Sequence, residues 1–208
     1  MNKIPISEVT NEDNMVMMAR YPDKFFDIAI VDPPYGINFG KFNRTNIDLI
    51  GNKIKSNKYK NSDWDNAIPE TAYFKELFRV SKNQIIWGGN YFPQLWVDGC
   101  KGFIFWFKHQ PVNNFADGEL AYTSFNRVAK CFNYPYYGNI NSEVRLHPTQ
   151  KPVALYDWLL TNYAKTGDKI LDTHLGSGSS RISAYKFILI FFLLIVGMNG
   201  IIKLQCLI

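Results

Sequence analysis

The chain has 208 residues, 47% hydrophobic and 20% charged, a composition that excludes a disordered or fibrous protein. Its 23 Lys and Arg against 18 Asp and Glu give a net charge of +5, and its length fits a single domain over residues 1–208. The three cysteines (100, 131 and 206) form no CxxC pair, so we expect neither a disulfide scaffold nor a zinc site, and no other metal. Acids at positions 8, 12 and 13 precede any apolar run, which is unlike a signal peptide and favours a cytoplasmic protein.

The predicted elements alternate between helices and strands along the chain. Helical patterns cover 11–20, 69–80, 152–165 and 179–186, and strand patterns cover 26–31, 84–87, 103–107, 119–125 and 169–172. Residues 37–66, rich in Asn, Lys and Gly, are predicted to form a long polar loop, and residues 126–147 are irregular. Strands separated by helical stretches predict an α/β sheet in which most strands are parallel.

The net charge is concentrated in one part of the polar loop. Residues 41–60 hold one acid, Asp48, and six basic residues, so this segment carries +5 and the rest of the chain is neutral. The six are Lys41, Arg44, Lys53, Lys55, Lys58 and Lys60. Such a cluster favours contact with the phosphates of a nucleic acid. The alternative is a solvated loop whose lysines only keep the chain soluble.

The string Asp32-Pro33-Pro34-Tyr35 directly follows the first predicted strand. Pro34 has no N–H and holds Pro33 extended, so the Pro33 carbonyl is free to accept a hydrogen bond from a ligand. The Asp32 carboxylate adds acceptors, and the Tyr35 ring can stack on a planar base. Two acceptors beside an aromatic ring can bind an amino group on a heterocycle, whereas the simpler interpretation is a capped turn.

A glycine turn follows the strand at 169–172. Asp172 ends that strand, and Gly176-Ser177-Gly178 leads into the next helix, which lets the backbone approach a ligand closely. Position 181 is arginine, so the dinucleotide pattern GxGxxG is not met, and no P-loop lysine follows the turn. A serine-hydrolase elbow is also missing. The three histidines lack the spacing of metal ligands and are interpreted as structural or surface residues.

Together these two sites resemble the DNA amino-methyltransferases, which methylate adenine N6 or cytosine N4 with S-adenosylmethionine. Residues 32–35 match the family's catalytic string and residues 172–178 its cofactor loop, although an aromatic residue is more usual at position 174. The order, catalytic string first, is that of the permuted β group. The resemblance covers residues 8–187 and implies a Rossmann-like methyltransferase sheet with a circularly permuted motif order.

The resemblance also implies which residues bind the cofactor. His147 to Pro152 resemble the segment that holds the methionine end, and Asp13 stands where the group has an acid near the cofactor's adenine. Residues 87–90 and 106–108 resemble the group's pocket strands. The implied cofactor-binding residues are Asp13, Thr149, Gln150, Lys151, Asp172, Gly176, Ser177 and Gly178.

The implied function is methylation of adenine N6 in double-stranded DNA, because aspartate rather than serine heads the catalytic string. Residues 37–66 would lie over the catalytic pocket, and residues 126–146 would take part in target recognition. Close relatives are often encoded by phages or prophages, and restriction-modification is an associated role. The alternatives are methylation of cytosine N4, RNA or glutamine, and an inactive, truncated remnant that still binds DNA.

Residues 187–208 differ in composition from the rest of the chain. They hold one charged residue, Lys203, and begin with an unbroken apolar run of ten, and no Asp or Glu follows Asp172. In the family, a strand and an acid that binds the cofactor ribose follow this helix. Three interpretations are open: a buried helix end and strand; a membrane anchor, for which the run is short; and a frameshift near codon 187 that truncates the enzyme. The 17 Lys against 6 Arg suggest an A+T-rich gene, in which out-of-frame codons readily give Phe, Leu and Ile.

Overall fold

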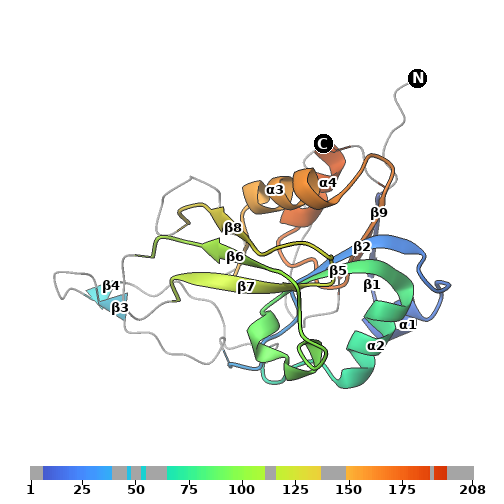
Figure 1. The fold of residues 1–208 in the computed structure, drawn as a ribbon, viewed down its shortest axis with the longest axis horizontal. Coiled ribbons are helices and arrows are strands. Elements are labelled where there is room, and N and C mark those ends of the chain that lie inside the picture. The colour runs from blue at the N-terminus through green and yellow to red at the C-terminus, as the bar shows by residue number, and fades with distance from the viewer. Residues whose placement is uncertain are drawn as a thin grey trace.

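The computed structural model describes residues 7–38, 65–110, 116–136 and 149–187, together with the backbone of 46–47, 53–54 and 190–195. Its centre is a sheet of eight strands in the order β1-β10-β9-β2-β5-β7-β6-β8 (Figure 1). The strands are β1 (Ser7–Asn11), β2 (Phe26–Val31), β5 (Ser81–Trp87), β6 (Phe103–Phe107), β7 (Gly118–Thr123), β8 (Lys130–Asn133), β9 (Lys169–Asp172) and β10 (Ile190–Ile195). A separate ladder joins β3 (Asn46–Ile47) to β4 (Lys53–Ile54).

The sheet is parallel from β1 to β5 and mixed beyond it. β1, β10, β9, β2 and β5 are parallel neighbours, β7 and β6 pair antiparallel, and β8 runs parallel to β6. In β2, Ile28 and Ile30 pack in one core cluster, and Ala29 and Val31 pack in a second. Because alternate side chains of a strand point to opposite faces, β2 is covered on both sides, which is why its sequence is an apolar run. The predicted α/β sheet with a parallel majority is confirmed.

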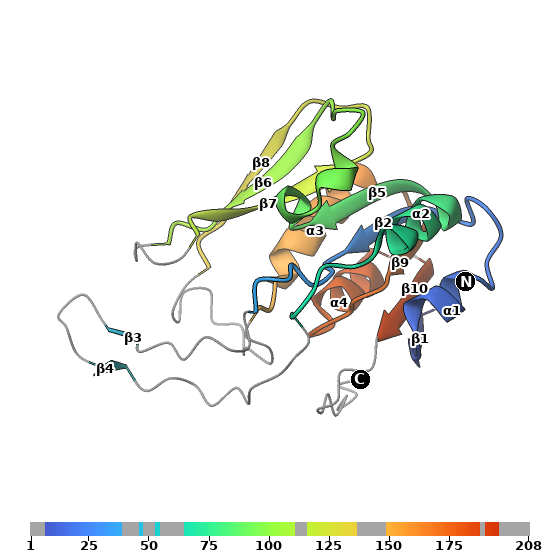
Figure 2. The same ribbon diagram turned by 90° about the horizontal axis from the view of Figure 1, so that it is seen from below.

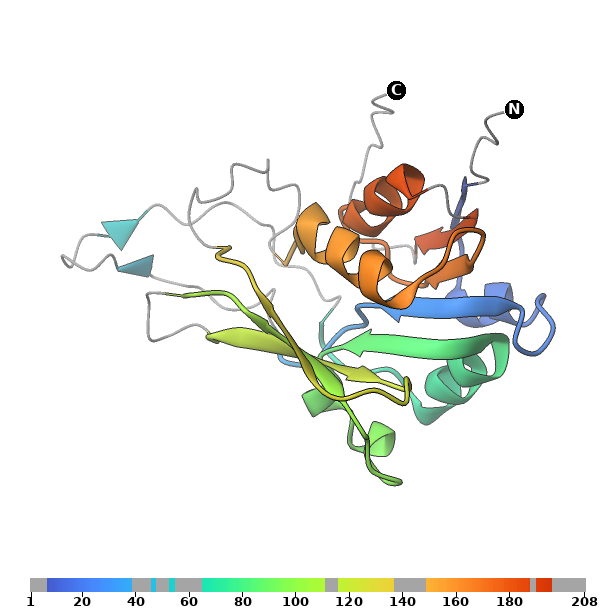
Figure 3. The same ribbon diagram turned by 45° about the horizontal axis from the view of Figure 1, so that its top comes forward.

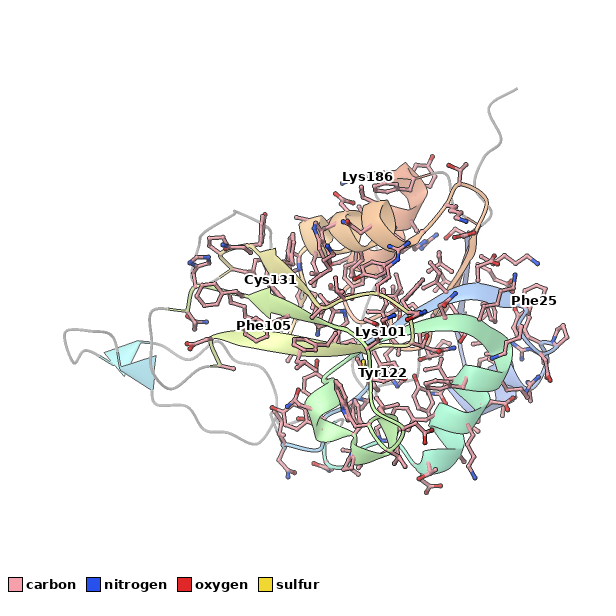
Figure 4. All side chains as sticks on the ribbon, viewed as in Figure 1. Phe25, Lys101, Phe105, Tyr122, Cys131 and Lys186 are labelled. Carbon is pink, nitrogen blue, oxygen red and sulfur yellow. The ribbon has the colours of Figure 1, made fainter. Side chains whose placement is uncertain are left out.

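Two pairs of helices cover the two faces of the sheet (Figures 1 and 3). The helices are α1 (Asn14–Met18), α2 (Thr71–Val80), α3 (Val153–Tyr163) and α4 (Ser179–Lys186). α3 and α4 pack in the core cluster that contains Ile28, with Leu155 and Leu159 fully buried. α1 and α2 pack in the cluster that contains Ala29, where Phe74 and Leu77 lie one helical turn apart. Side chains fill the space between the strands and both helical layers (Figure 4).

The sequence patterns miss the two-residue strands β3 and β4, which lie inside the predicted polar loop, and the short edge strands β1 and β8. β8 lies inside the segment predicted to be irregular, and β1 precedes the predicted first helix. Their burial patterns are mixed, because edge strands face solvent on one side and so lack a long apolar run. α1 is also shorter than predicted: Asp13 Oδ1 accepts the N–H groups of Met15 and Val16 at 2.9 and 3.0 Å and so caps the helix there.

The apolar tail supplies an inner strand of the sheet. Ile190–Ile195 form β10, which is hydrogen-bonded between β1 and β9 (Figure 2). Of the three interpretations of residues 187–208, a strand therefore describes 190–195, and residues 196–208 lie outside the described part. In the ranges that the structure describes, no helix is long and apolar enough to cross a membrane. A frameshift near codon 187 stays a hypothesis that the nucleotide sequence would test.

Candidate active site

The carboxyl ends of β2 and β9 bring the two predicted motifs to one edge of the sheet. The strands are parallel neighbours, with Ile28 opposite Ile170 and Ala29 opposite Leu171 (Figure 2). From β9 the chain passes through α4 to β10, and from β2 it passes through α2 to β5 on the other side. In open α/β sheets, ligands bind beyond the carboxyl ends of the strands where the order reverses in this way.

The Asp32 carboxylate, at the end of β2, has a partner on each oxygen. The Tyr35 hydroxyl donates to Oδ1 at 2.7 Å, and Lys151 Nζ lies 2.5 Å from Oδ2. Pro33 between them is buried, while Asp32 and Tyr35 are half-buried. Burial, and next the charge of Asp32, raise the pKa of Tyr35 well above its usual value, so the phenol stays a donor at neutral pH.

Asp32 belongs to a cluster of four charged side chains. Lys151 Nζ is also 3.0 Å from Oε2 of Glu119 on β7, and Lys108 pairs with Oε1 of the same carboxylate. Burial by itself would raise the pKa of Glu119, but Lys151 and then Lys108 outweigh it and hold that pKa at about 2. Burial alone would lower the pKa of Lys151. The charges of Asp32 and Glu119 outweigh this effect, so the pKa of Lys151 is raised above its usual value. Two anions and two cations therefore face one another beside the catalytic string.

Lys151 is predicted to bind the cofactor, and the structure places its ammonium on the carboxylate of Asp32, a predicted catalytic residue. Glu119 is a functional candidate that the sequence patterns do not indicate, whereas Lys108 lies in the segment 106–108 that resembles the group's pocket strands. Glu119 lies inside a strand pattern, where an acid is interpreted as an ordinary solvent-facing residue. Its sole sequence signal is that it is one of the few charged residues between 110 and 125.

Asp65 fixes the turn that follows the catalytic string. Its side chain is 2% exposed, and Oδ1 accepts the N–H groups of Tyr35 and Gly36, each at 2.8 Å. The Asp65 carbonyl accepts the N–H of Asn38 at 2.9 Å. Asp65 comes from the far end of the predicted polar loop, so its contact with position 35 is another one that linear spacing does not reveal.

The Tyr35 ring is held against the segment after β5. It stacks on Tyr91 of η2 (Gly89–Tyr91) with centroids 5.0 Å apart and planes at 15°. Gly88 has φ +69°, and a Cβ there would lie 2.1 Å from Tyr35 Cε1, so both the backbone conformation and the space require glycine. The segment 87–90, predicted to be part of a pocket, thus forms a wall beside the catalytic string.

The Asp172 loop adopts the open turn that its glycines predict. Gly176 and Gly178 have φ of +55° and +81°, and a Cβ at either would meet no heavy atom nearer than 3.9 Å. Asp172 is buried, and its carboxylate accepts the Ser180 hydroxyl at 2.6 Å and the His174 N–H at 2.9 Å. Burial raises the pKa of Asp172 to about 7, against these hydrogen bonds. The hydroxyls of Ser177 and Ser179 are 3.0 Å apart.

His174 occupies the position where the resembled family more often has an aromatic residue. Its ring packs edge-on to Tyr73 of α2 with centroids 5.5 Å apart, and Nδ1 is 2.8 Å from the Thr173 hydroxyl. That hydroxyl is 2.7 Å from the Tyr73 hydroxyl. Desolvation lowers the pKa of His174 to about 4, so the imidazole is neutral at pH 7. The structural role expected for this histidine fits these contacts, which join the Asp172 loop to α2.

The remaining predicted site residues are only partly described. Asp13 is an exposed N-cap beyond the end of β1, and Thr149 and Gln150 are half-buried residues directly before Lys151. The side chains of the six basic residues between 41 and 60 lie outside the described residues, as do positions 137–146 of the predicted target-recognition segment. Among the described residues, no group of three or more His, Cys, Asp or Glu is arranged to hold a metal ion.

Comparisons with solved structures found proteins of similar fold. The fold is similar to that of M1.HpyAVI bound to S-adenosylmethionine, with 16% identity, 92% of this chain and 94% of that chain covered, and a TM-score of 0.60. It is also similar to the cytosine-N4-specific PvuII DNA methyltransferase (9% identity, 94% and 86% covered, TM-score 0.61). A third match is the Thermus thermophilus protein TTHA0409 in complex with S-adenosylmethionine (14% identity, 92% and 88% covered, TM-score 0.52).

The sequence itself matches one family model, described as DNA methylase, over residues 87–186. The matched region contains Glu119, Lys151 and the Asp172 loop, and the fold sets the Asp32 string beside it. The fold is similar to that of M1.HpyAVI and of the PvuII DNA methyltransferase. Residues 87–186 are thus similar to the N6/N4 DNA methylase family.

Proposed function

We propose that the chain transfers a methyl group from S-adenosylmethionine to the N6 amine of an adenine flipped out of double-stranded DNA. One observation carries the proposal: Asp32 and the Asp172 loop follow neighbouring parallel strands and meet at one edge of the sheet. A carboxylate acceptor for an amine beside a loop for the methyl donor is the arrangement that this reaction needs.

Asp32 and the Pro33 carbonyl would accept the two N–H groups of the target amine. The lone pair of an exocyclic amine is delocalised into the base, which makes the amine a poor nucleophile. Hydrogen bonds to two acceptors out of the ring plane favour a pyramidal nitrogen and direct its lone pair towards the reacting methyl group. The contribution of the chain is then positioning and electrostatics, without a covalent intermediate on the protein. Base flipping brings the amine to this edge, where Tyr35 and Tyr91 offer an aromatic surface.

The Asp172 loop has the features of a cofactor site. The open space in front of Gly176 and Gly178 leaves room for a ligand against the backbone, and Gly178 precedes the first N–H groups of α4. Bound S-adenosylmethionine would supply an activated methyl group on its sulfonium. We propose that this loop, Thr149 and Gln150 hold the cofactor and that Asp13 contacts its adenine.

Adenine is the proposed base because Asp32 heads the catalytic string, as in adenine-N6 enzymes of the resembled family. The fold alone does not separate the two bases, since the cytosine-N4-specific PvuII enzyme shares it. The basic residues between 41 and 60 are the proposed contacts to the DNA phosphates, and residues 126–146 the proposed target-recognition segment.

The test is incubation of the purified chain with tritiated S-adenosylmethionine and duplex DNA, followed by nucleoside analysis. We expect N6-methyladenine from the wild type and none from Asp32→Ala, while calorimetry gives the same cofactor affinity for both proteins. N4-methylcytosine would correct the base, and label in RNA or protein alone would move the enzyme to another substrate class. A wild type that binds DNA but neither the cofactor nor a methyl group would establish the inactive remnant instead.

A further inference from the structure

Lys151 lies buried between two carboxylates. Its side chain is 3% exposed, and its ammonium contacts groups from two other parts of the chain, the catalytic string and β7. We propose that Lys151 is a positioning residue for the catalytic carboxylate Asp32, and that Glu119 holds Lys151 in place. The inference rests on the proposed methyl transfer and assigns to Lys151 a role other than cofactor binding.

The contacts of Lys151 use its whole hydrogen-bonding capacity. An ammonium group has three N–H donors and no acceptor. Three oxygens lie within reach of Nζ: Asp32 Oδ2 at 2.5 Å, Glu119 Oε2 at 3.0 Å and the Tyr35 hydroxyl at 3.2 Å. Since all three donors have partners inside the site, none is left for the carboxylate or ribose of a cofactor.

The same contacts fix the orientation of Asp32. Tyr35 binds Oδ1 and Lys151 binds Oδ2, so rotation of the carboxylate about its Cβ–Cγ bond would break both interactions. Each carboxylate oxygen has two lone-pair sites, so one on each remains for a substrate N–H. Asp32 can therefore accept from an amine without giving up its protein partners.

Glu119 holds Lys151 from a firmly placed strand. It lies in β7, opposite Trp106 of β6, and its second oxygen is held by Lys108. A group mounted on a paired strand is placed more firmly than one on a loop, whereas Lys151 and Asp32 both lie in connecting segments. Glu119 also balances the ammonium, so that Asp32 is not the only anion on Lys151.

The experiment compares four variants that change the same cluster: Lys151→Met, Glu119→Gln, the Lys151→Met/Glu119→Gln double variant, and Lys108→Met. Lys108→Met is the matched control, because it removes an equal positive charge that contacts Glu119 but has no contact with Asp32 among the interactions described. For each variant we measure S-adenosylmethionine affinity by calorimetry and the single-turnover methylation rate at saturating cofactor and DNA. Thermal unfolding reports whether the variant is folded.

We expect the single-turnover rate of Lys151→Met to fall about 100-fold, the order that misplacement of a reacting group causes, with unchanged cofactor affinity. Glu119→Gln should lose less, and Lys108→Met least. If the isolated Lys151→Met change leaves buried charge that prevents folding, the double variant restores charge balance and should fold, yet remain slow. Recovery of the rate in the double variant would show that only net charge matters and would overturn the proposal. If Lys151→Met weakens cofactor binding but has a normal rate at saturating cofactor, Lys151 binds the cofactor and the proposal is wrong.

A second measurement does not depend on activity. Asp32→Asn is combined in turn with Lys151→Met and with Lys108→Met, and the urea midpoints of single and double variants form two cycles. We expect a non-additive shift for the pair with Lys151 and additive shifts for the pair with Lys108. Additive shifts in both cycles would overturn the positioning role. An inactive wild type with coupled Asp32 and Lys151 would instead reject only the proposed function.

Discussion

At the scale of single residues, the catalytic string depends on the absence of a side chain at Gly88. Gly88 lets the Tyr35 ring lie almost against the backbone after β5, where stacking on Tyr91 and the hydroxyl bond to Asp32 fix the ring and its tip. A methyl group at position 88 cannot be added without moving the ring. The hydrogen bond to Asp32 Oδ1 is therefore linked to a glycine more than fifty residues further along the chain.

Gly88→Ala should reduce both stability and catalysis. The cost combines left-handed strain with a Cβ 2.1 Å from Tyr35 Cε1, and we expect about 3 kcal/mol of stability lost. Gly99→Ala is the matched control, since Gly99 has φ +72° but nothing within 4 Å of its Cβ, and should cost about 1 kcal/mol with normal activity. Urea unfolding and methyl-transfer rates check this. Equal effects of the two substitutions would show that the contact with Tyr35 does not matter.

At the scale of elements, the turn between β9 and α4 combines buried Asp172 and half-buried His174, whose protonation has opposite effects on the free energy of unfolding. The pKa of His174 is lowered to about 4, so the unfolded chain binds more protons there between pH 4 and 6.5, and this group adds stability as the pH rises. The pKa of Asp172 is raised to about 7, so the folded chain binds more protons between about 4 and 7, and this group loses stability as the pH rises. The two contributions nearly cancel, so the joint contribution of His174 and Asp172 to the free energy of unfolding changes little between pH 4 and 6.5.

Replacing either residue should reveal the pH dependence that the other one contributes to stability. His174→Phe keeps a ring against Tyr73 but removes the gain in stability that His174 gives as the pH rises. The stability of the variant minus that of the wild type should therefore be greater at pH 5 than at pH 7. Asp172→Asn should show the opposite trend, better at pH 7 than at pH 5. Urea denaturation at the two pH values measures both differences. A pH-independent difference for both variants would contradict the assigned pKa shifts.

The elements that the sequence predicts well are those that are buried on both sides or bounded by turns. The strands at 26–31, 103–107 and 169–172 are apolar runs or end at a Pro- or Gly-rich turn, and the structure has them with those bounds. β1 and β8 are short edge strands without such a run. For the site, the strings at 32–35 and 172–178 are local and can be recognised from the sequence. Contacts of Glu119, Lys151 and Asp65 join distant segments, and they follow only from the order of strands in the sheet.

At the scale of the whole molecule, the charge distribution predicts how DNA binding responds to salt. Residues 41–60 carry a net +5, and the rest of the sequence is neutral. If all six basic residues there neutralise a phosphate, log K should fall against log salt with a slope of about −5, at about −0.9 per phosphate. The charge distribution thus predicts that the proposed partner, double-stranded DNA, is bound through this one segment rather than through the whole surface.

Changing Lys53, Lys55 and Lys58 to Gln should make that slope less negative by about 3. The matched control changes Lys75, Lys101 and Lys165, three exposed lysines in the described part of the chain, to Gln. Fluorescence anisotropy with a labelled duplex, at salt concentrations between about 50 and 200 mM, gives both slopes. The same slope for the wild type and both triple variants would return residues 41–60 to the role of a solvated loop.

The place of β10 also constrains the order in which the chain assembles. β1 has β10 as its partner in the sheet, so the strand at 7–11 pairs with a strand at 190–195, which is synthesised much later. Until those residues emerge, the backbone of 7–11 has no strand to join, and α1 has no strand β10 to contact. Closing the long loop between residues 11 and 190 costs entropy that local contacts do not repay beforehand. β1 therefore joins the sheet only once β10 is available, later than strands whose partners lie nearer in the sequence.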